Sequence, residues 1–343
     1  MKPLAIDLFS GCGGLTLGLK RAGFDVIGAV DVDPLAVETY KANHKRISLW
    51  SQDIRSLPAV RVMRRLKLRR GQLDLLAGCP PCQGFSTMTT LNGRTIRDDP
   101  RNDLVLEFLR FVRILRPKAV MMENVPGFAK DERIERFVAA LEAIGYRCKR
   151  DVLNAADYGV PQRRRRFILL AGRRGEIPFA RLARRKSSVR EAFKNLRKRA
   201  RRDPLHQVAE RRSKRVRQMI RLIPKDGGSR SALRKKRQLK CHRKCDGFKD
   251  VYGRMAWNRV APTITGGCCN PSKGRFLHPV RHRAITPREA ALLQTFPPRY
   301  FFSLRRGKFA AAQMIGNALP PEFIRRHARS VLRFLQTRSA ARP

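Results

Sequence analysis

Acidic residues are scarce in this sequence, which has 27 Asp and Glu against 76 Lys and Arg in 343 residues. The resulting formal net charge of +49 favours a polyanionic partner and argues against a function limited to a small neutral substrate. The chain also lacks an apolar run of about 18 residues and a secretory leader, so we expect a cytoplasmic protein with no membrane association. A hydrophobic content of 42% nevertheless predicts a folded core.

A disulfide framework is not expected, because eight cysteines in a chain of this length do not follow the pattern of a small secreted domain. One set of residues has the types that bind zinc: Cys241, His242, Cys245, Cys268 and Cys269. Its Cys-x3-Cys spacing and its adjacent cysteines fit tetrahedral zinc poorly. We therefore favour free thiols over a zinc site and predict no bound metal.

Short apolar runs alternate with segments of helical periodicity in the first half of the chain. The runs occupy residues 4–9, 26–30, 73–77, 119–122 and 167–171. Continuous apolar strands that alternate with amphipathic helices predict an α/β fold with a doubly wound, mostly parallel sheet.

The composition changes after about residue 175. Arg and Lys dominate residues 184–249, and a solvated charge run or a disordered linker is one interpretation of that segment. Aromatic and apolar residues at 252–257 and 262–265 favour a folded module instead. We predict a first domain of residues 1–175, a smaller basic domain of residues 176–302, and a C-terminal segment of residues 303–343 that packs back on the first domain.

Two predicted strand ends carry residues typical of a nucleoside site. Residues 7–14 (DLFSGCGG) form a glycine turn without the G-x-G-x-x-G spacing of dinucleotide folds, and no P-loop lysine is present. Asp31 ends the second strand, where an acid commonly binds ribose hydroxyls, and Asp53 is a candidate for an adenine amino group. These residues favour a nucleoside cofactor, with helix caps or turns as the alternative role of each acid.

Two further strand ends offer a thiol and an acid. Cys82 lies in residues 78–86 (GCPPCQGFS), and Glu123 opens residues 123–127 (ENVPG). Parallel strands bring these groups to one edge of the sheet, where they suggest covalent catalysis on an electrophile that must be protonated. The alternatives are a buried cysteine, as we expect for Cys79, and a salt bridge from Glu123 to an arginine.

The same strings carry a resemblance to the bacterial modification type of DNA (cytosine-5)-methyltransferase. The resemblance runs from residue 7 to about residue 331 in the order usual for that family. It rests on six segments, which are residues 7–14, 80–83 (PPCQ), 123–125 (ENV), 162–166 (QRRRR), 288–297 (with REA and LQTFP) and 316–320 (GNALP). Six segments in order make a specific match, whereas any one of them is modest evidence.

The resemblance implies the Rossmann-like fold of class I S-adenosylmethionine-dependent methyltransferases. It also implies methyl transfer to C5 of cytosine in a specific double-stranded DNA sequence, with the base flipped out of the duplex and joined through C6 to Cys82. Glu123 would protonate or hydrogen-bond N3, Arg166 would contact O2, and Arg164 would support the site. The basic domain would then be the target-recognition domain.

The resemblance also assigns binding residues. S-adenosylmethionine, which leaves as S-adenosylhomocysteine, would contact Phe9, Ser10, Gly11, Gly13, Gly14, Asp31, Val32, Asp53, Ile54, Pro81 and Asn317. DNA would contact Ser86, Arg254 and Thr263. Residues 83–101 would close over the flipped base. The expected partner is double-stranded DNA, with a cognate restriction endonuclease acting separately. We expect a monomer associated with the nucleoid of a bacterial or archaeal cell.

Two other functions fit parts of the sequence. RNA cytosine methyltransferases of the tRNA-modifying branch share these strings, but the long basic insert favours a DNA-reading enzyme. A basic nucleic-acid-binding protein without activity is the second alternative, and the presence of both Cys82 and Glu123 argues against it.

Overall fold

The computed structural model describes residues 1–81, 103–194, 196, 202–208, 210–243 and 250–339. Contacts divide the chain into two compact units. The first unit comprises residues 1–158, 165–182 and 319–343, and the second comprises residues 159–164 and 183–318. The structure therefore groups residues 303–318 with the second unit, whereas we had assigned them to the C-terminal segment.

The first unit is built on a seven-stranded sheet in the order β3-β2-β1-β4-β5-β7-β6. Strands β1 to β5 are parallel to one another, and β7 is antiparallel to its two neighbours, β5 and β6. The predicted doubly wound, mostly parallel α/β sheet is confirmed. The strands are β1 (Leu4–Leu8), β2 (Asp25–Asp31), β3 (Ser48–Ser51), β4 (Leu75–Gly78), β5 (Ala119–Asn124), β6 (Arg147–Asn154) and β7 (Arg165–Gly172).

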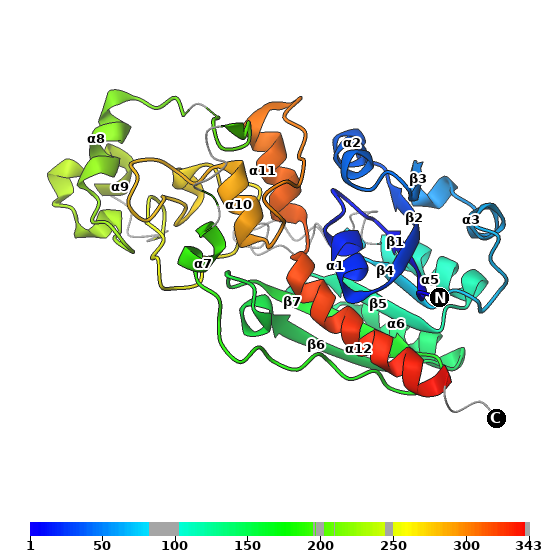
Figure 1. Cartoon of the computed structure of the whole chain (residues 1–343). Helices are drawn as coiled ribbons and strands as arrows, with labels where there is room; N and C mark the ends of the chain where they lie inside the picture. Colours follow the sequence, from blue (N-terminus) through cyan, green and yellow to red (C-terminus); the bar gives the residue numbers. More distant parts are fainter. Residues whose placement is uncertain (82–102, 195, 197–201, 209, 244–249, 340–343) are drawn as a thin grey trace. The chain divides into compact units, whose positions relative to one another are not determined.

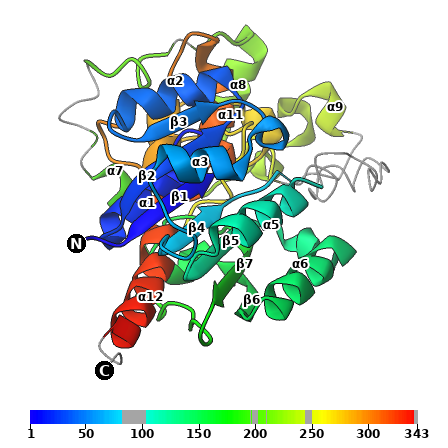
Figure 2. The same ribbon diagram turned by 90° about the vertical axis from the view of Figure 1, so that its right-hand side faces the viewer.

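Helices cover both faces of this sheet (Figures 1 and 2). On one face α3 packs on α5 and α5 on α6, and on the other α1 packs on α12. The helices of the unit are α1 (Gly14–Ala22), α2 (Pro34–Asn43), α3 (Ala59–Arg65), α5 (Leu104–Leu115), α6 (Glu132–Ala143) and α12 (Pro321–Ser339). Buried strands covered on both sides explain why their sequences are almost continuously apolar.

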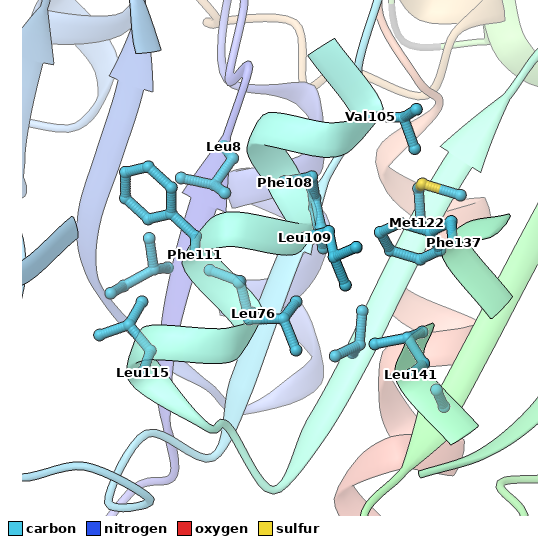
Figure 3. Packing of buried hydrophobic residues seen from close by; sticks show 14 of the residues in the cluster. Leu8, Leu76, Val105, Phe108, Leu109, Phe111, Leu115, Met122, Phe137 and Leu141 are labelled. Carbon is cyan, nitrogen blue, oxygen red and sulfur yellow. The ribbon is translucent and has the colours of Figure 1, made fainter. Parts of the chain in front are cut away.

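The main core lies between the sheet and α5. Phe108, Phe111 and Val112 of α5 are fully buried, because apolar residues recur at helical spacing along one face of this helix. They belong to one buried cluster with Leu76 and Met122 of the sheet. Figure 3 shows Phe108 and Phe111 of α5 in this cluster. Packing against α5 therefore fixes the strands that lead to the candidate site.

On the other face of the sheet, the last helix, α12, packs closely on α1 at a glycine. A Cβ on Gly18 of α1 would lie 2.5 Å from the Ile324 Cβ of α12, so only glycine allows the two helices to approach this closely. This contact anchors the end of the chain, at α12, to the first unit.

The second unit has short helices and long connections. Its helices are α7 (Val189–Phe193), α8 (Lys214–Leu222), α9 (Lys240–Arg243), α10 (Pro287–Leu293) and α11 (Gly307–Asn317). Thr286 begins α10 with a capping box to Glu289, and Pro287 occupies the first turn. Across the described part of the whole chain, no helix is long and apolar enough to cross a membrane.

Candidate active site at the carboxyl edge of the sheet

The glycine turn after β1 adopts backbone conformations that glycine favours. Gly11 and Gly13 have φ angles of +53° and +91°, and Phe9 between the strand and the turn has a φ of +60°. Among the residues that the structure describes, no atom outside the turn's own neighbours lies within 4 Å of a Cβ built on Gly11, so the turn is open there. Gly14 begins α1, whose first N–H groups point toward the same turn. This geometry can admit a ligand close to the backbone.

Asp31 faces this turn from the end of β2. Its carboxylate accepts hydrogen bonds from the Gly11 N–H at 2.6 Å and the Asp33 N–H at 2.9 Å. Burial raises its pKa, and the two backbone bonds oppose that rise. A carboxylate has about four acceptor positions, so capacity remains for ribose hydroxyls. The side chain of Val32, which follows, is 62% exposed and offers an apolar surface beside it.

The turn also holds buried polar atoms that lack a partner. Ser10 Oγ and Asp7 Oδ1 are buried and make no hydrogen bond among the described residues. Buried polar atoms are normally satisfied, so these two mark the turn as a place where a polar ligand fits. Phe9, Ser10 and Gly11 thus lie in this turn, and Asp31 and the following Val32 lie at the end of the neighbouring strand β2. These are five of the residues that the resemblance assigns to a nucleoside cofactor.

Asp7 is the buried centre of a small network that the sequence did not reveal. Its Oδ2 accepts from the Thr16 N–H at 3.0 Å and from Thr16 Oγ1 at 2.6 Å, and Thr16 Oγ1 also bonds the Tyr40 hydroxyl. Desolvation raises the pKa of Asp7 to about 7. The folded protein therefore holds a proton on Asp7 at pH values where the unfolded chain has lost it.

Replacing Asp7 by Asn should reveal that proton through stability. The folded pKa is raised from 3.8 to about 7, so wild-type stability falls as pH rises through this window and levels off above it. Asn does not titrate, so the stability of D7N relative to wild type should rise by about 4 kcal/mol across the window. Urea unfolding of the first unit, followed by Trp50 fluorescence in a W257F background, measures this. A difference that does not change with pH would contradict it.

Asp53 has a different partner from the one the resemblance assigns. Its carboxylate caps the turn at Ile54 and accepts three hydrogen bonds from the Arg55 side chain, the shortest at 2.6 Å. The Arg55 hydrogen bonds lower the pKa of Asp53. The turn role that we considered as an alternative is therefore observed, and an adenine amino group would have to compete with Arg55.

Glu123 is fixed between two neighbours at the end of β5. Its Oε1 lies 2.8 Å from Arg166 Nε on β7, and both side chains are mostly buried. The Cys79 thiol lies beside the Glu123 carboxyl group, because the register of β4 on β5 brings the two strand ends together. The salt bridge that we considered as an alternative role is thus present, and its partner is Arg166, a predicted catalytic residue.

Cys79 is held as a neutral thiol in this arrangement. Burial, followed by the nearby Glu123 and Asp7 carboxyl groups, raises its pKa well above the usual value for cysteine. A neutral thiol is a poor nucleophile. Cys79 is therefore an unreactive neighbour of Glu123, which the sequence did not indicate.

The Pro-Pro turn leads from this pair toward the predicted nucleophile. Asn124 Nδ2 donates to the Pro80 carbonyl oxygen at 3.2 Å, which fixes the turn against the end of β5. Pro81 is the last residue that the structure describes before Cys82. Cys82, Ser86 and the predicted closing segment 83–101 lie outside the described residues.

Three distant motif segments meet inside the second unit. Gln162 donates to Gln294 Oε1 at 2.6 Å and accepts from the Ile264 N–H at 3.0 Å. Gln294 in turn donates to the Ile315 carbonyl oxygen. A Cβ on Gly316 would lie 2.2 Å from the Thr265 carbonyl carbon, so glycine is required there. These contacts hold the segments around residues 162, 294 and 316 next to one another in the folded unit.

Arg164 and Asn317 belong to that framework. Arg164 is buried, and its Nη1 donates to the Ile264 carbonyl oxygen at 3.0 Å. Asn317 ends α11 with an exposed side chain that accepts from Gln313 Nε2 at 3.1 Å. Thr263 Oγ1 donates to the Arg163 carbonyl oxygen at 2.6 Å. Arg164 and Thr263 therefore join residues 163–164 to residues 263–264, whereas the printed bond of Asn317 stays within α11.

Arg254 does not lie where a DNA phosphate could reach it. Its side chain is fully buried and donates to the carbonyl oxygens of Ile220, Ile223, His278 and Arg281 at 2.6–3.1 Å. Burial lowers its pKa. The predicted DNA contact at Arg254 is therefore corrected to a structural role, because its guanidinium joins the end of α8 to residues 278–281.

Replacing Arg254 by Met should destabilise the second unit by about 3 kcal/mol or more, since it leaves buried carbonyl groups unsatisfied. Unfolding followed by Trp257 fluorescence in a W50F background measures this. The matched control is R281M, which removes an exposed arginine nearby. Unchanged stability together with weaker DNA binding in R254M would restore the phosphate contact.

The candidate zinc residues are only partly described. Cys268 and Cys269 are buried and share a hydrogen bond, while Cys241 is exposed. Cys245 lies outside the described residues. Among the residues that the structure describes, no three His, Cys, Asp or Glu side chains form a metal-binding group.

Comparison with known proteins identifies the family. Residues 4–333 match the sequence model of the C-5 cytosine-specific DNA methylases. Type II methylase M.HgiDII of Herpetosiphon aurantiacus is 36% identical, over 96% of this chain and 95% of the relative. Type II methyltransferase M1.HphI of Haemophilus parahaemolyticus is 35% identical, over 96% of this chain and 86% of the relative.

Solved structures agree with the fold. An E. coli prophage protein described as a DNA modification methyltransferase superposes with a TM-score of 0.70 at 25% identity, over 97% of this chain and 99% of that one. The Dnmt2 methyltransferase of S. pombe gives 0.62 at 20% identity with full coverage of both chains, which shows the fold alone. The predicted class I methyltransferase fold is confirmed. The chain belongs to the C-5 cytosine-specific DNA methylases and is a DNA (cytosine-5) methyltransferase.

Proposed function

We propose that this enzyme methylates cytosine C5 in a specific double-stranded DNA sequence, using S-adenosylmethionine and a covalent Cys82–C6 intermediate on a flipped base. The observation that carries the proposal is the fixed Glu123 carboxyl group. It is paired with Arg166 and lies beside Cys79 at the strand end next to the Pro80–Pro81 turn, from which Cys82 follows directly in sequence.

The opening at the glycine turn would hold the cofactor. Asp31 would bind the ribose, and Phe9 and Val32 would flank the adenine, with the free space over Gly11 admitting the rest of the molecule. Ser10, Gly13, Gly14, Ile54, Pro81 and Asn317 complete the proposed set, and Asp53 would have to release Arg55 to join it. S-adenosylmethionine supplies an electrophilic methyl group on a sulfonium and leaves as S-adenosylhomocysteine.

The protein side chains activate cytosine for that transfer. The Cys82 thiolate adds to C6, which makes C5 electron-rich enough to accept the methyl group. Glu123 shares a proton with N3 as the thiolate adds, and Arg166 donates to O2, so both reduce the charge that develops on the ring. A base then removes the C5 proton, the C5–C6 double bond re-forms, and Cys82 leaves as the thiolate.

The target base must leave the duplex before this chemistry begins, at a cost of a few kcal/mol. Cationic side chains that contact phosphates offset this cost. A formal net charge of +49 provides many such contacts, and residues 176–302, as the proposed target-recognition domain, would select the sequence.

The relatives named Type II methyltransferases suggest a setting for the reaction. We propose that the enzyme acts as a cytoplasmic monomer bound to chromosomal DNA. A cognate restriction endonuclease would recognise the same sequence separately.

The test is transfer of a labelled methyl group from S-adenosylmethionine to a genomic duplex, followed by bisulfite mapping. We expect 5-methylcytosine at one position of one short sequence. Matched arms contain the same sequence as single-stranded RNA or as structured tRNA. Transfer to RNA with none to duplex DNA would overturn the proposal, as would methylation spread over cytosines without a shared sequence.

A further inference from the structure

The edge of the sheet opposite the candidate active site carries an exposed group of arginines. Strands β4 and β5 run toward the active-site edge, so the segments that enter them lie at the other edge, where the antiparallel β7 also ends. We call the six arginines of these segments the basal arginine surface. They are Arg69, Arg70, Arg113, Arg116, Arg173 and Arg174.

Backbone hydrogen bonds join these segments into one surface. The Gly71 N–H donates to the Leu115 carbonyl oxygen at 2.8 Å, and the Arg173 N–H donates to the Lys118 carbonyl oxygen at 3.0 Å. Arg173 Nη1 also donates to the Arg116 carbonyl oxygen at 3.0 Å. The arginines are therefore held near one another by the fold of the first unit alone.

This positive charge is not neutralised by acids. The two acids nearest in sequence already have other partners: Asp74 pairs with Lys118 at 2.7 Å, and Glu176 pairs with Lys149 at 2.6 Å. Within the described residues, none of the six arginines forms an ion pair with a carboxylate. Elsewhere in the same unit comparable arginines do, such as Arg150 with Glu135 at 2.8 Å. A group of unpaired guanidinium groups repels itself unless an anion binds.

Helix ends do not account for the surface. A cation in the last turn of a helix is stabilised by the helix dipole, which explains Arg113 at the end of α5. Arg69, Arg70, Arg173 and Arg174 lie outside helices. Their forked N–H groups match phosphate oxygens without reading bases.

We propose that the basal arginine surface binds the phosphate backbone of a second DNA segment while the opposite edge acts on the first. The β5 strand of 6 residues puts about 20 Å between the two edges, so one straight duplex at the active site does not reach the basal surface. The enzyme would hold two duplex segments together, and part of its large charge would serve this second contact.

The test is a bridging assay with the full-length protein. A biotinylated duplex on beads captures a second, fluorescent duplex only when the protein holds both. The test variant is R69Q/R70Q/R113Q/R174Q, which leaves Arg116 and Arg173 in place because they lie in the backbone hydrogen bonds of this edge. The control K130Q/R136Q/K149Q/R150Q also removes four positive charges, but from other parts of the first unit.

We expect the test variant to lose capture by about tenfold or more, and its capture to depend less on salt by about 0.9 in log–log slope for each lost phosphate contact. The control should keep capture near the wild-type level. Methylation of a short duplex with one target should stay within about twofold in both variants, since that duplex uses only the active-site edge.

Several results would overturn the proposal. Equal capture by test and control variants would show that net charge or a protein dimer makes the bridge. No bridging by the wild type would remove the second site. Displacement by single-stranded RNA at far lower concentration than by duplex DNA would assign the surface to RNA. Absent methylation with intact bridging would instead count against the proposed function, so the two failures are distinguishable.

Discussion

Replacing Cys82 by Ser is expected to reduce methyl transfer on the order of 10³-fold or more, because the nucleophile that activates C5 is lost. A serine hydroxyl is a far weaker nucleophile than a thiolate, and nothing else in the proposed mechanism makes C5 reactive. Initial rates of labelled methyl transfer to the target duplex measure the loss. DNA binding should remain, because the substitution changes one atom of one side chain.

A covalent trap makes the same prediction visible directly. Cytosine with fluorine at C5 cannot release a proton there, so the reaction should stop with the enzyme joined to DNA. Wild-type protein should form a complex that survives denaturing electrophoresis, and C82S should not. The matched control is C79S in the same segment, which keeps a hydroxyl donor for Glu123 and should still form the complex. A complex formed by C82S but not by C79S would exchange the roles of the two cysteines.

The sequence predicted the elements whose pattern is local. Helices α2 and α5 have clear local signals, which are Pro34 in the first turn of α2 and the apolar face of residues 104–115 in α5. Strand β6 was not identified. It lies at the sheet edge and contains Arg, Lys and Asp, so it has no continuous apolar run.

The contacts between the residues of the candidate site were harder to predict from the sequence than the residues themselves. Glu123 and Cys79 are 44 positions apart, and only the register of β4 on β5 places them together. In the sequence Asp7 is part of a glycine-turn motif, and nothing local indicates that one oxygen of its buried carboxyl group bonds Thr16. Arg254 was predicted as a DNA contact from the family resemblance. Its partners are four carbonyl groups from two distant segments, which no local pattern reveals.

Replacing Glu123 by Gln is expected to lower the rate of methyl transfer by about 10²- to 10⁴-fold, the usual contribution of a positioned acid or base. Gln keeps the size of the side chain but cannot give a proton to N3. It also leaves Arg166 without its partner at 2.8 Å, so the unfolding of E123Q must be measured beside its activity. The matched control is E135Q, which breaks the exposed pair with Arg150 and should keep nearly full activity.

The Glu123–Arg166 pair gives this prediction a second test that a purely structural role would not pass. If both residues act on the same ring in one step, the loss in E123Q/R166Q should be much smaller than the product of the two single losses. If the ion pair only stabilises the fold, R166Q should lower stability without lowering the rate per folded molecule. Active-site titration with the C5-fluorinated duplex counts the competent molecules and separates the two cases. Full activity in folded E123Q would remove the acid from the mechanism.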